Sequence, residues 1–269
     1  MLNFIIPLKS RAVSKDWEIV QRLCQRSVRS VLQQTSDKFR LILVCTDQLD
    51  IDLSHPAVTV LREDFPIPDS RPESRMDDKG LKVRRGLVEA GKSGAAHVMI
   101  VDADDCIHRQ LAEWVHKHDI RQSWTIDQGY WYEEGSPIIR LIKDFDRICG
   151  TSFVARLESG DFPVDMEAPR GSYFDYLIDG HVKAADYLRG HGRPVASLPF
   201  PGSVYVKETG ENYTGKKGPG FQYQGLRTHL RRLAQIRPLT PATRANFGLY
   251  PLAADRHRES AYLEPQRRM

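Results

Sequence analysis

Apolar and polar positions follow one another along the chain in a pattern that predicts strands and helices in turn. Apolar runs of strand length lie at residues 2–7, 39–46, 57–62 and 96–102. Between the first two runs, apolar residues recur with helical spacing over residues 15–34, and Ser14 is suitably placed to cap that helix. A second helix is predicted over residues 78–92. Strands that alternate with helices favour an α/β fold with a doubly wound, mostly parallel sheet.

The second half of the chain continues with shorter predicted elements. They are strands at residues 123–132 and 137–143, which form a hairpin, and a helix that begins near residue 181. Residues 63–78, in the first half, contain three prolines and many charges, which predicts a long loop before the second helix.

Three carboxylates, Asp102, Asp104 and Asp105, follow directly on the apolar run at residues 96–102. Like charges at this spacing repel one another, so a cation is expected among them. Carboxylates in an Asp-x-Asp arrangement suit a hard divalent ion that keeps open positions for phosphate oxygens. The alternative is a solvated turn in which Asp104 or Asp105 caps a helix that begins near His108.

Three of the predicted strands end in residues that can meet a ligand, namely Pro7, Asp47 and Asp102. The carboxyl ends of parallel strands lie at one edge of a sheet, and ligands bind beyond that edge. The order of the elements therefore predicts a binding site at these three residues.

Five motifs occur in order along the first half of the chain. They are a strand ending in Pro7, a helix ending in Ser-Val-Arg-Ser-Val-Leu-Gln-Gln-Thr (residues 27–35), a strand ending at Asp47, a basic, glycine-containing helix at residues 79–87, and Asp-Ala-Asp-Asp at residues 102–105. This order resembles the family 2 glycosyltransferases of GT-A fold, within the nucleotide-diphospho-sugar transferase superfamily. The resemblance covers residues 3–106 well and residues 149–212 loosely, and within the latter residues 149–156 resemble the family's returning strand. Two positions depart from the family: Leu8 replaces the usual Asn after the proline, and Thr46 stands where a second Asp is common.

The resemblance implies a Rossmann-like GT-A domain over residues 1–215, with a nucleotide-sugar half at 1–106 and an acceptor half at 107–215. It implies metal-dependent, inverting transfer of a sugar from a UDP- or GDP-sugar to a hydroxyl of a carbohydrate or lipid-linked acceptor. Asp104 and Asp102 are then expected to bind Mn²⁺ or Mg²⁺. The residues expected to contact the donor nucleotide are Pro7, Asp47, Lys79, Arg84, Asp102 and Lys207.

Basic residues contribute to the predicted donor site in two places. Lys79, Lys82, Arg84 and Arg85 stand near the start of the second predicted helix, where a helix N-terminus and lysines suit a diphosphate, and at least one of them is expected to contact phosphate. The alternative is an ordinary solvated basic face. Lys207 stands about where the resembling family often has His, and a charged Lys there can contact the diphosphate but cannot bind a metal ion.

The catalytic base is predicted in the segment that contains Asp179 and His181. The resembling family commonly has an acidic pair here, and in this chain the acid is shifted or replaced. Asp179 is suited to act as general base toward an acceptor hydroxyl, and His181 is either a second base candidate or a metal ligand. The alternatives are that Asp179 caps the helix beginning near His181, and that His181 is a solvated residue of its first turn.

Residues 216–269 differ in charge from the rest of the chain. They hold eleven Lys and Arg against three Asp and Glu, whereas the whole chain has a net charge of only +4. Leu226, Leu230, Leu233 and Ile236 form an apolar stripe on a predicted basic helix. This C-terminal helical extension is interpreted in three ways: docking onto the body, peripheral contact with an anionic membrane surface, or contact between copies of the chain.

Four widely spaced cysteines and the absence of an 18-residue apolar run indicate free thiols and a cytoplasmic location, with peripheral attachment to the inner face of the membrane as an option. No nucleic-acid-binding motif is present, so a nucleic-acid partner is not expected. Two functions remain as alternatives to glycosyl transfer. One is sugar-phosphate nucleotidyl transfer, although residues 7–13 lack the glycines of its phosphate loop, and the other is a non-catalytic nucleotide- or sugar-binding protein of the same fold.

Overall fold

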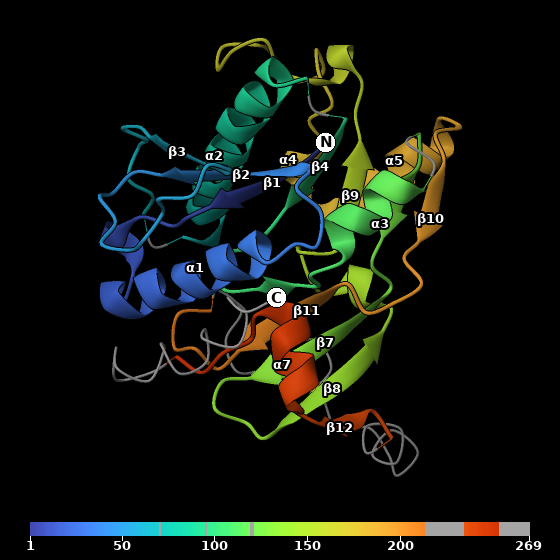
Figure 1. The fold of residues 1–269 in the computed structure, drawn as a ribbon. Helices are drawn as coiled ribbons and strands as arrows, with labels where there is room; N and C mark the ends of the chain where they lie inside the picture. The colour runs from blue at the N-terminus through green and yellow to red at the C-terminus, as the bar shows by residue number, and fades with distance from the viewer. Residues whose placement is uncertain (70, 95, 119–120, 213–233, 253–269) are drawn as a thin grey trace.

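The chain forms two β-sheets with helices packed around them, as the computed structural model shows (Figure 1). The structure describes the chain except residues 70, 95, 119–120, 213–233 and 253–269. The larger sheet has seven strands, in the spatial order β10 (Val195–Ser197), β6 (Ser123–Thr125), β9 (Phe153–Arg156), β4 (His97–Ile100), β1 (Leu2–Pro7), β2 (Phe39–Cys45) and β3 (Val58–Arg62). Neighbouring strands run parallel except where β9 pairs with β4 and β6. The predicted α/β class with a mostly parallel central sheet is therefore confirmed.

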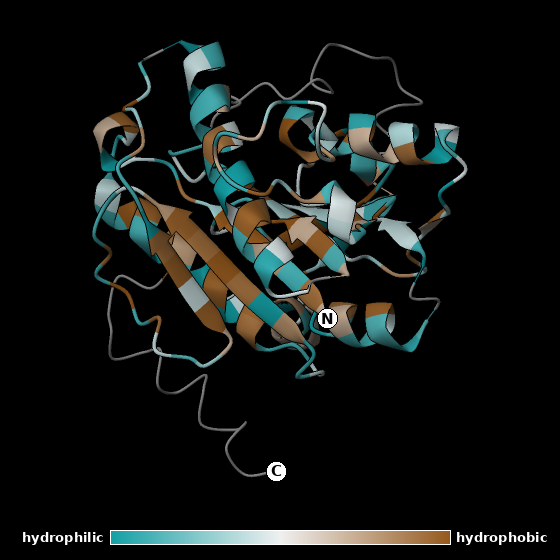
Figure 2. Ribbon diagram, turned by 90° about the horizontal axis from the view of Figure 1, so that it is seen from above, coloured by the Kyte–Doolittle hydropathy of each residue, from teal (hydrophilic) through white to brown (hydrophobic). Residues whose placement is uncertain are grey.

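Helices cover both faces of this sheet, as predicted. α1 (Trp17–Leu32) and α3 (Leu111–Lys117) pack on one face, and α2 (Pro72–Lys92), α4 (Tyr176–Asp179) and α5 (His181–Gly190) pack on the other. The alternation of side chains along β1 produces this division, because Phe4 and Ile6 contact the first group while Ile5 contacts the second. In Figure 2 the strands are mostly hydrophobic, whereas the helices carry hydrophobic and hydrophilic positions side by side.

A second, smaller sheet lies beside the first. Its strands, in spatial order, are β12 (Ile236–Pro238), β8 (Ile138–Lys143), β7 (Gln128–Glu133), β11 (Ser203–Lys207) and β5 (Cys106–Ile107). α7 (Pro241–Phe247) packs on it, with Phe247 in one cluster with Tyr132 and Val204. Three short 3₁₀ helices complete the described elements: Arg11–Val13, Phe145–Arg147 and Ser159–Asp161.

Two predicted boundaries in the first half of the chain are wrong. Asp16, and not Ser14, caps α1, since its carboxylate accepts hydrogen bonds from the backbone N–H groups of Glu18 and Ile19. The predicted loop at 63–78 is shorter, because α2 already begins at Pro72. Proline suits the first turn of a helix, whose N–H groups have no intrahelical partner, so Pro72 starts the helix and does not interrupt it.

The predicted hairpin and returning strand also differ from the structure. Residues 123–132 do not form one strand: β6 belongs to the large sheet and β7 to the small one, so the true hairpin is β7–β8. The returning strand β9 begins only at Phe153, and residues 149–152 form the turn that precedes it.

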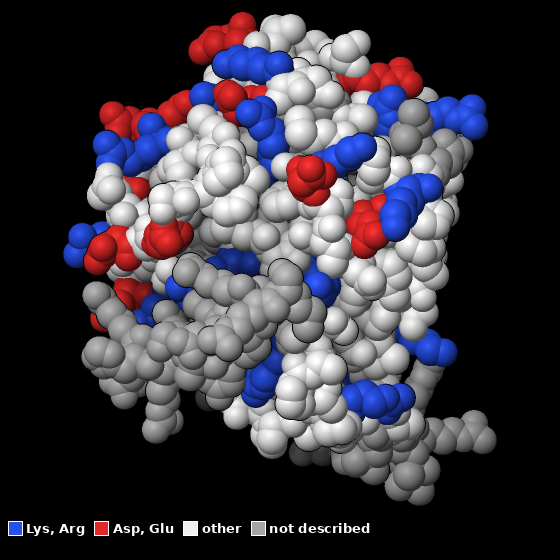
Figure 3. All heavy atoms as spheres, in the orientation of Figure 1, with Lys and Arg blue, Asp and Glu red and all other residues white. Residues whose placement is uncertain are grey.

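The basic C-terminal stretch packs onto the body where the structure describes it. Most of the predicted amphipathic helix at 226–236 lies outside the described residues, but Ile236 lies in a strand, β12, which pairs with β8. In the lower part of the face in Figure 3, where Figure 1 places β8, β12 and α7, most of the charged side chains in view are Lys or Arg. No helix within the described residues is both long and apolar enough to span a bilayer.

Candidate functional site

A cavity of about 300 Å³ opens at the carboxyl edge of the large sheet. It lies between the end of β1, the first half of α2, the loop that follows β4 and the segment that follows β11. Pro7, Lys79, Asp102 and Asp104 line it, so the structure brings together four of the residues that the sequence predicted for the donor or metal site.

Asp102 and Lys79 form an ion pair at the rim of this cavity. The Lys79 ammonium donates to Asp102 Oδ1 at 2.5 Å, and both side chains are about one-third exposed. Burial acts to lower the pKa of Lys79, but the carboxylates of Asp102, Asp105 and Asp104 outweigh it and the pKa is raised. Gly150 leaves room for the pair, because a Cβ at that position would lie 3.0 Å from Asp102 Oδ2.

The side chain of Asp104 accepts a hydrogen bond from an amide, and its pKa is raised. The Asn212 amide donates to Asp104 Oδ2 at 2.9 Å, and to the Val206 carbonyl oxygen at the same distance. Burial, and next the negative charge of Asp102, raise the pKa of Asp104 to about 6. Two repelling carboxylates at the mouth of a cavity attract a cation, which relieves the repulsion.

Asp105 turns away from the cavity and supports the site from the core. It is fully buried, and its carboxylate accepts hydrogen bonds from the Thr151 hydroxyl at 2.6 Å and the Val206 N–H at 3.1 Å. Burial, followed by the charges of Asp104 and Asp102, raises the pKa of Asp105 well above its usual value. The same Thr151 oxygen accepts the backbone N–H of Asp102, so the two acids share one anchor.

Replacing Asp105 with alanine is expected to destabilise the fold by about 2–3 kcal/mol, because Thr151 and the Val206 N–H would lose their buried acceptor. Urea unfolding followed by circular dichroism measures the change. Asp102→Ala is the matched control, since its side chain is partly exposed and its loss should cost much less. Equal unfolding midpoints for the two variants would contradict the structural role of Asp105.

The helix-cap alternative for the acidic cluster is wrong. Gln110 occupies the N-cap position of α3 and makes no side-chain cap bond, so neither Asp104 nor Asp105 caps a helix. The acids therefore have no local structural task at a helix terminus.

The carboxylates at the cavity can hold a metal ion only together with a bound ligand. Within the described part of the chain, no three His, Cys, Asp or Glu side chains are grouped to hold a metal together. Asp102 and Asp104 supply two carboxylates, and Mg²⁺-type ions are bound by one or two carboxylates together with substrate phosphates and water. These residues fit an ion that arrives with a diphosphate and do not fit a closed protein cage.

Three other residues predicted for donor binding do not line the cavity. The Asp47 carboxylate accepts the backbone N–H of Arg11 at 2.8 Å. Arg84 donates to the Ala168 carbonyl oxygen and lies over the Tyr173 ring, 5.6 Å from its centroid. The third of these residues is Lys207.

Lys207 is almost fully buried beside an aromatic pair. Its ammonium lies 4.9 Å from the ring centroid of Tyr205 and 5.8 Å from that of Trp131. Burial lowers the pKa of Lys207, although Asp104, Asp105 and Glu208 act in the opposite direction. Tyr205 lines the cavity, and Lys207 contacts Tyr205 without lining the cavity itself.

The predicted base residues lie on the elements beside α2. Ile178 of α4 packs where Gly80 of α2 has no side chain, since a Cβ there would lie 2.9 Å from it. Asp179 is exposed, and its carboxylate accepts from Arg170 at 2.7 Å. Arg170 also donates to Asp175 at 2.9 Å, so one guanidinium bridges both acids.

His181 is the first residue of α5 and lies outside the main cavity. Its Nε2 is buried and, within the described residues, has no hydrogen-bond partner. Burial lowers the pKa of His181. The negative charge of Asp102 acts to raise this pKa, and the positive charge of Lys79 acts to lower it. The alternative that Asp179 is the N-cap of α5 is wrong, because Gly180 occupies the N-cap position of that helix.

Two acids that line the cavity, Glu211 and Asp78, were not predicted as site residues. Glu211 accepts hydrogen bonds from Lys9 and from the Asp16 N–H, the latter at 2.7 Å, and so ties the residues after β1 to those after β11. Asp78 and Lys82 form a buried ion pair at 2.7 Å. Their i, i+4 spacing was visible in the sequence, but the predicted loop placed Asp78 at the very end of an unstructured segment.

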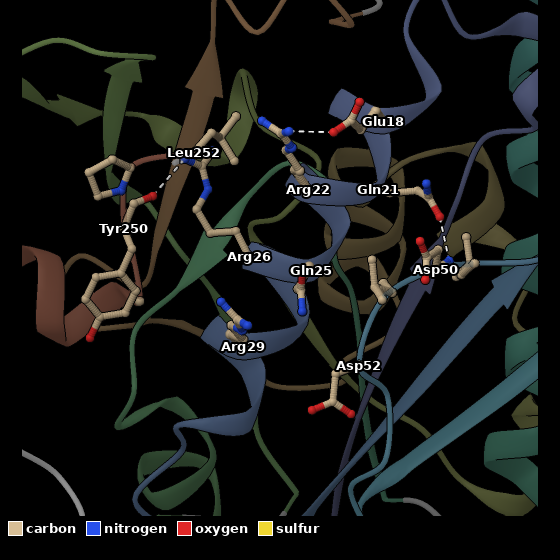
Figure 4. A pocket seen from close by; sticks show the side chains of 14 residues that line it. Glu18, Gln21, Arg22, Gln25, Arg26, Arg29, Asp50, Asp52, Tyr250 and Leu252 are labelled. Atoms are coloured by element: carbon tan, nitrogen blue, oxygen red, sulfur yellow. Dashed lines mark hydrogen bonds and ion pairs between the residues drawn. The ribbon is translucent and has the colours of Figure 1, made fainter. Parts of the chain in front are cut away.

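A second cavity, of about 530 Å³, lies on the outer side of α1 (Figure 4). Two of its arginines pair with neighbours: Arg22 donates to Glu18, and Arg26 donates to Glu134 and to the Tyr250 carbonyl oxygen. It is away from the strand ends and contains none of the predicted site residues.

Comparison with known proteins gives fold-level likenesses only. No protein-family model and no curated protein matches the chain. Staphylococcus aureus TarS 1-349 in complex with UDP-GlcNAc is similar at 10% identity and a TM-score of 0.40, over 79% of this chain and 61% of that one. A putative nucleotide-diphospho-sugar transferase from Desulfovibrio desulfuricans G20 is similar at 14% identity and a TM-score of 0.33, over 76% of this chain and 79% of that one. The chain spans about 60% of the length of TarS 1-349. At these identities and TM-scores, function has to be argued from the site itself.

Proposed function

We propose that the chain is a glycosyltransferase that moves a sugar from a nucleoside-diphosphate donor to an acceptor hydroxyl. The observation that carries this proposal is the cluster of Asp102, Asp104 and Lys79 at the mouth of a cavity on the carboxyl edge of a mostly parallel sheet. Sheets of this kind bind ligands at that edge.

The cluster suits the leaving group of such a reaction. Asp102 and Asp104 would hold Mn²⁺ or Mg²⁺ together with the diphosphate, and the ion when bound supplies Lewis-acid stabilisation of the departing phosphate charge. Lys79 is kept charged by the three acids and is placed to neutralise a phosphate oxygen once its bond to Asp102 loosens. Pro7 and the residues beside it form the wall against which the nucleoside would pack.

The acceptor side is proposed around α4 and α5. A single in-line displacement needs a base on the face of the sugar opposite the leaving group, and Asp179 or His181 would remove the acceptor proton there. The Gly80–Ile178 contact supports this location, because it brings α4 next to the turn of α2 that carries Lys79. The acceptor is proposed to be a carbohydrate or lipid-linked hydroxyl.

A panel of nucleotides tests this function. Isothermal calorimetry with UDP, GDP, CDP and ADP, each with and without Mn²⁺, is expected to show binding of at least one diphosphate that Mn²⁺ strengthens about tenfold or more. Preferential binding of the nucleoside triphosphates would instead indicate nucleotidyl transfer. Binding of a nucleotide sugar without turnover, over a range of acceptors, would favour the non-catalytic alternative.

A further inference from the structure

Three side chains on α2 form a polar stripe along one wall of the cavity. Arg75, Asp78 and Lys82 are spaced i, i+3 and i+7, so they lie one above another on the same face of the helix. All three line the cavity. With a rise of about 1.5 Å per residue, Asp78 is separated along the axis from Arg75 by about 4.5 Å and from Lys82 by about 6 Å. The acid therefore lies between two cationic donors.

The stripe has hydrogen-bonding capacity that the described chain leaves unused. Asp78 is 6% exposed; its Oδ2 accepts from Lys82, whose side chain is completely buried, while its Oδ1 has no partner among the described residues. Arg75 Nε is likewise buried without a described partner. Unpaired buried polar atoms are uncommon in folded proteins, and at a cavity wall they indicate a ligand.

We propose that this stripe recognises the base of the donor nucleotide and that the base is uracil; the proposal rests on the proposed function and narrows its donor to a uridine diphosphate sugar. Uracil presents an N–H between two carbonyl oxygens. Asp78 Oδ1 accepts that N–H and Arg75 donates to a flanking carbonyl oxygen, while the completely buried Lys82 holds Asp78 Oδ2 in place. Pro7, Pro68 and Met76 supply apolar surface for the faces of the ring.

The other bases match the stripe less well. Guanine presents two neighbouring N–H donors, which need both oxygens of a carboxylate, and Lys82 already occupies Asp78 Oδ2. Cytosine and adenine place a ring nitrogen lone pair where uracil has its N–H, so they would face Asp78 Oδ1 with another acceptor or shift along the wall. Only uracil, or its methylated form, pairs with both Asp78 Oδ1 and Arg75 and leaves no base N–H facing the occupied Asp78 Oδ2.

Calorimetry with UDP, CDP, GDP and ADP in the presence of MnCl₂ tests the proposal on the full chain. The wild-type protein is expected to bind UDP at least about tenfold more tightly than the other three. In Asp78→Asn the amide can turn its NH₂ toward the base. The affinity for UDP should then fall about tenfold or more, whereas the affinity for CDP, whose base offers a lone pair at that position, should rise relative to that for UDP.

Arg75→Met provides a second variant, because Arg75 is partly exposed and its loss leaves the buried Asp78–Lys82 pair intact. This variant is expected to bind UDP severalfold more weakly than the wild-type protein, and its circular dichroism spectrum should be unchanged. Arg71→Met is the matched control: Arg71 adjoins the same helix, is largely exposed and pairs with Asp69, and it does not line the cavity.

The outcomes separate this proposal from the function on which it rests. Tighter binding of GDP or ADP than of UDP, or unchanged base preference in both Asp78→Asn and Arg75→Met, would overturn uracil recognition and leave glycosyl transfer standing. If none of the four diphosphates binds the wild-type protein, the proposed function is wrong as well.

Discussion

Asp104→Ala is expected to abolish Mn²⁺-dependent binding of a nucleoside diphosphate while the fold stays intact. Asp104 lines the cavity beside Asp102, and among the described residues the only side-chain partner of its carboxylate is the Asn212 amide. Calorimetry with UDP and GDP, with and without Mn²⁺, measures the effect. Asp186→Ala, an exposed acid of α5, serves as the control. An unchanged affinity in Asp104→Ala would exclude the metal role.

The same side chain predicts a dependence on pH. A proton competes with the metal ion for Asp104, whose pKa is raised to about 6, so Mn²⁺-dependent binding should weaken as the pH falls through about 6. The free protein responds in the opposite sense: because the folded-state pKa lies above the ordinary one of 3.8, ionisation of Asp104 costs stability as the pH rises from about 4 to about 6. An affinity that does not change between pH 7 and pH 5 would contradict this assignment.

Asp179→Asn is expected to lower turnover by about 10²–10⁴ with little change in donor affinity, as removal of a general base does. The amide keeps the shape of the side chain and can still accept from Arg170, so the fold should be retained. Asp186→Asn is the matched control, since Asp186 is an exposed acid that also pairs with an arginine, Arg189. Steady-state kinetics with a UDP- or GDP-sugar measures the split between kcat and KM.

His181→Ala distinguishes the second candidate. If His181 binds the metal ion or the diphosphate, the variant should weaken donor binding, whereas loss of a base should lower turnover alone. Near-normal turnover in Asp179→Asn would transfer the base role to Asp175 or His181. If substitutions at all three positions are silent, the chain is better described as a nucleotide- or sugar-binding protein.

The sequence predicted the large sheet well because its signals are local. Every residue of β1, β2 and β4 except Arg40 is buried, and the alternation of strands with helices predicted that the strands run parallel. The same logic placed Pro7, Asp102 and Asp104 together, since parallel strands end at one edge. Lys79 also reached the cavity, although from the interior of α2 and not from its first turn.

The remaining details of the site depend on contacts that no local pattern encodes. Asp105 looked equivalent to Asp104 in the sequence, but the turn after β4 directs its side chain toward Thr151 and the core. Arg84 looked equivalent to Lys79, but five residues of helix rotate it toward the Ala168 carbonyl. The β6–β7 division arose because two short strands separated by two residues joined different sheets.

The contacts made by Glu211 and Asn212 also set an order of events during synthesis. Glu211 bonds to Lys9 across 202 residues of sequence, and Asn212 bonds to Asp104 across 108. Contacts so distant along the chain close large loops and form late in folding. A growing chain that has completed β1, β2 and β4 therefore still carries an open acidic cluster. The cavity acquires the wall that Glu211 and Asn212 contribute only after residue 212 has emerged from the ribosome.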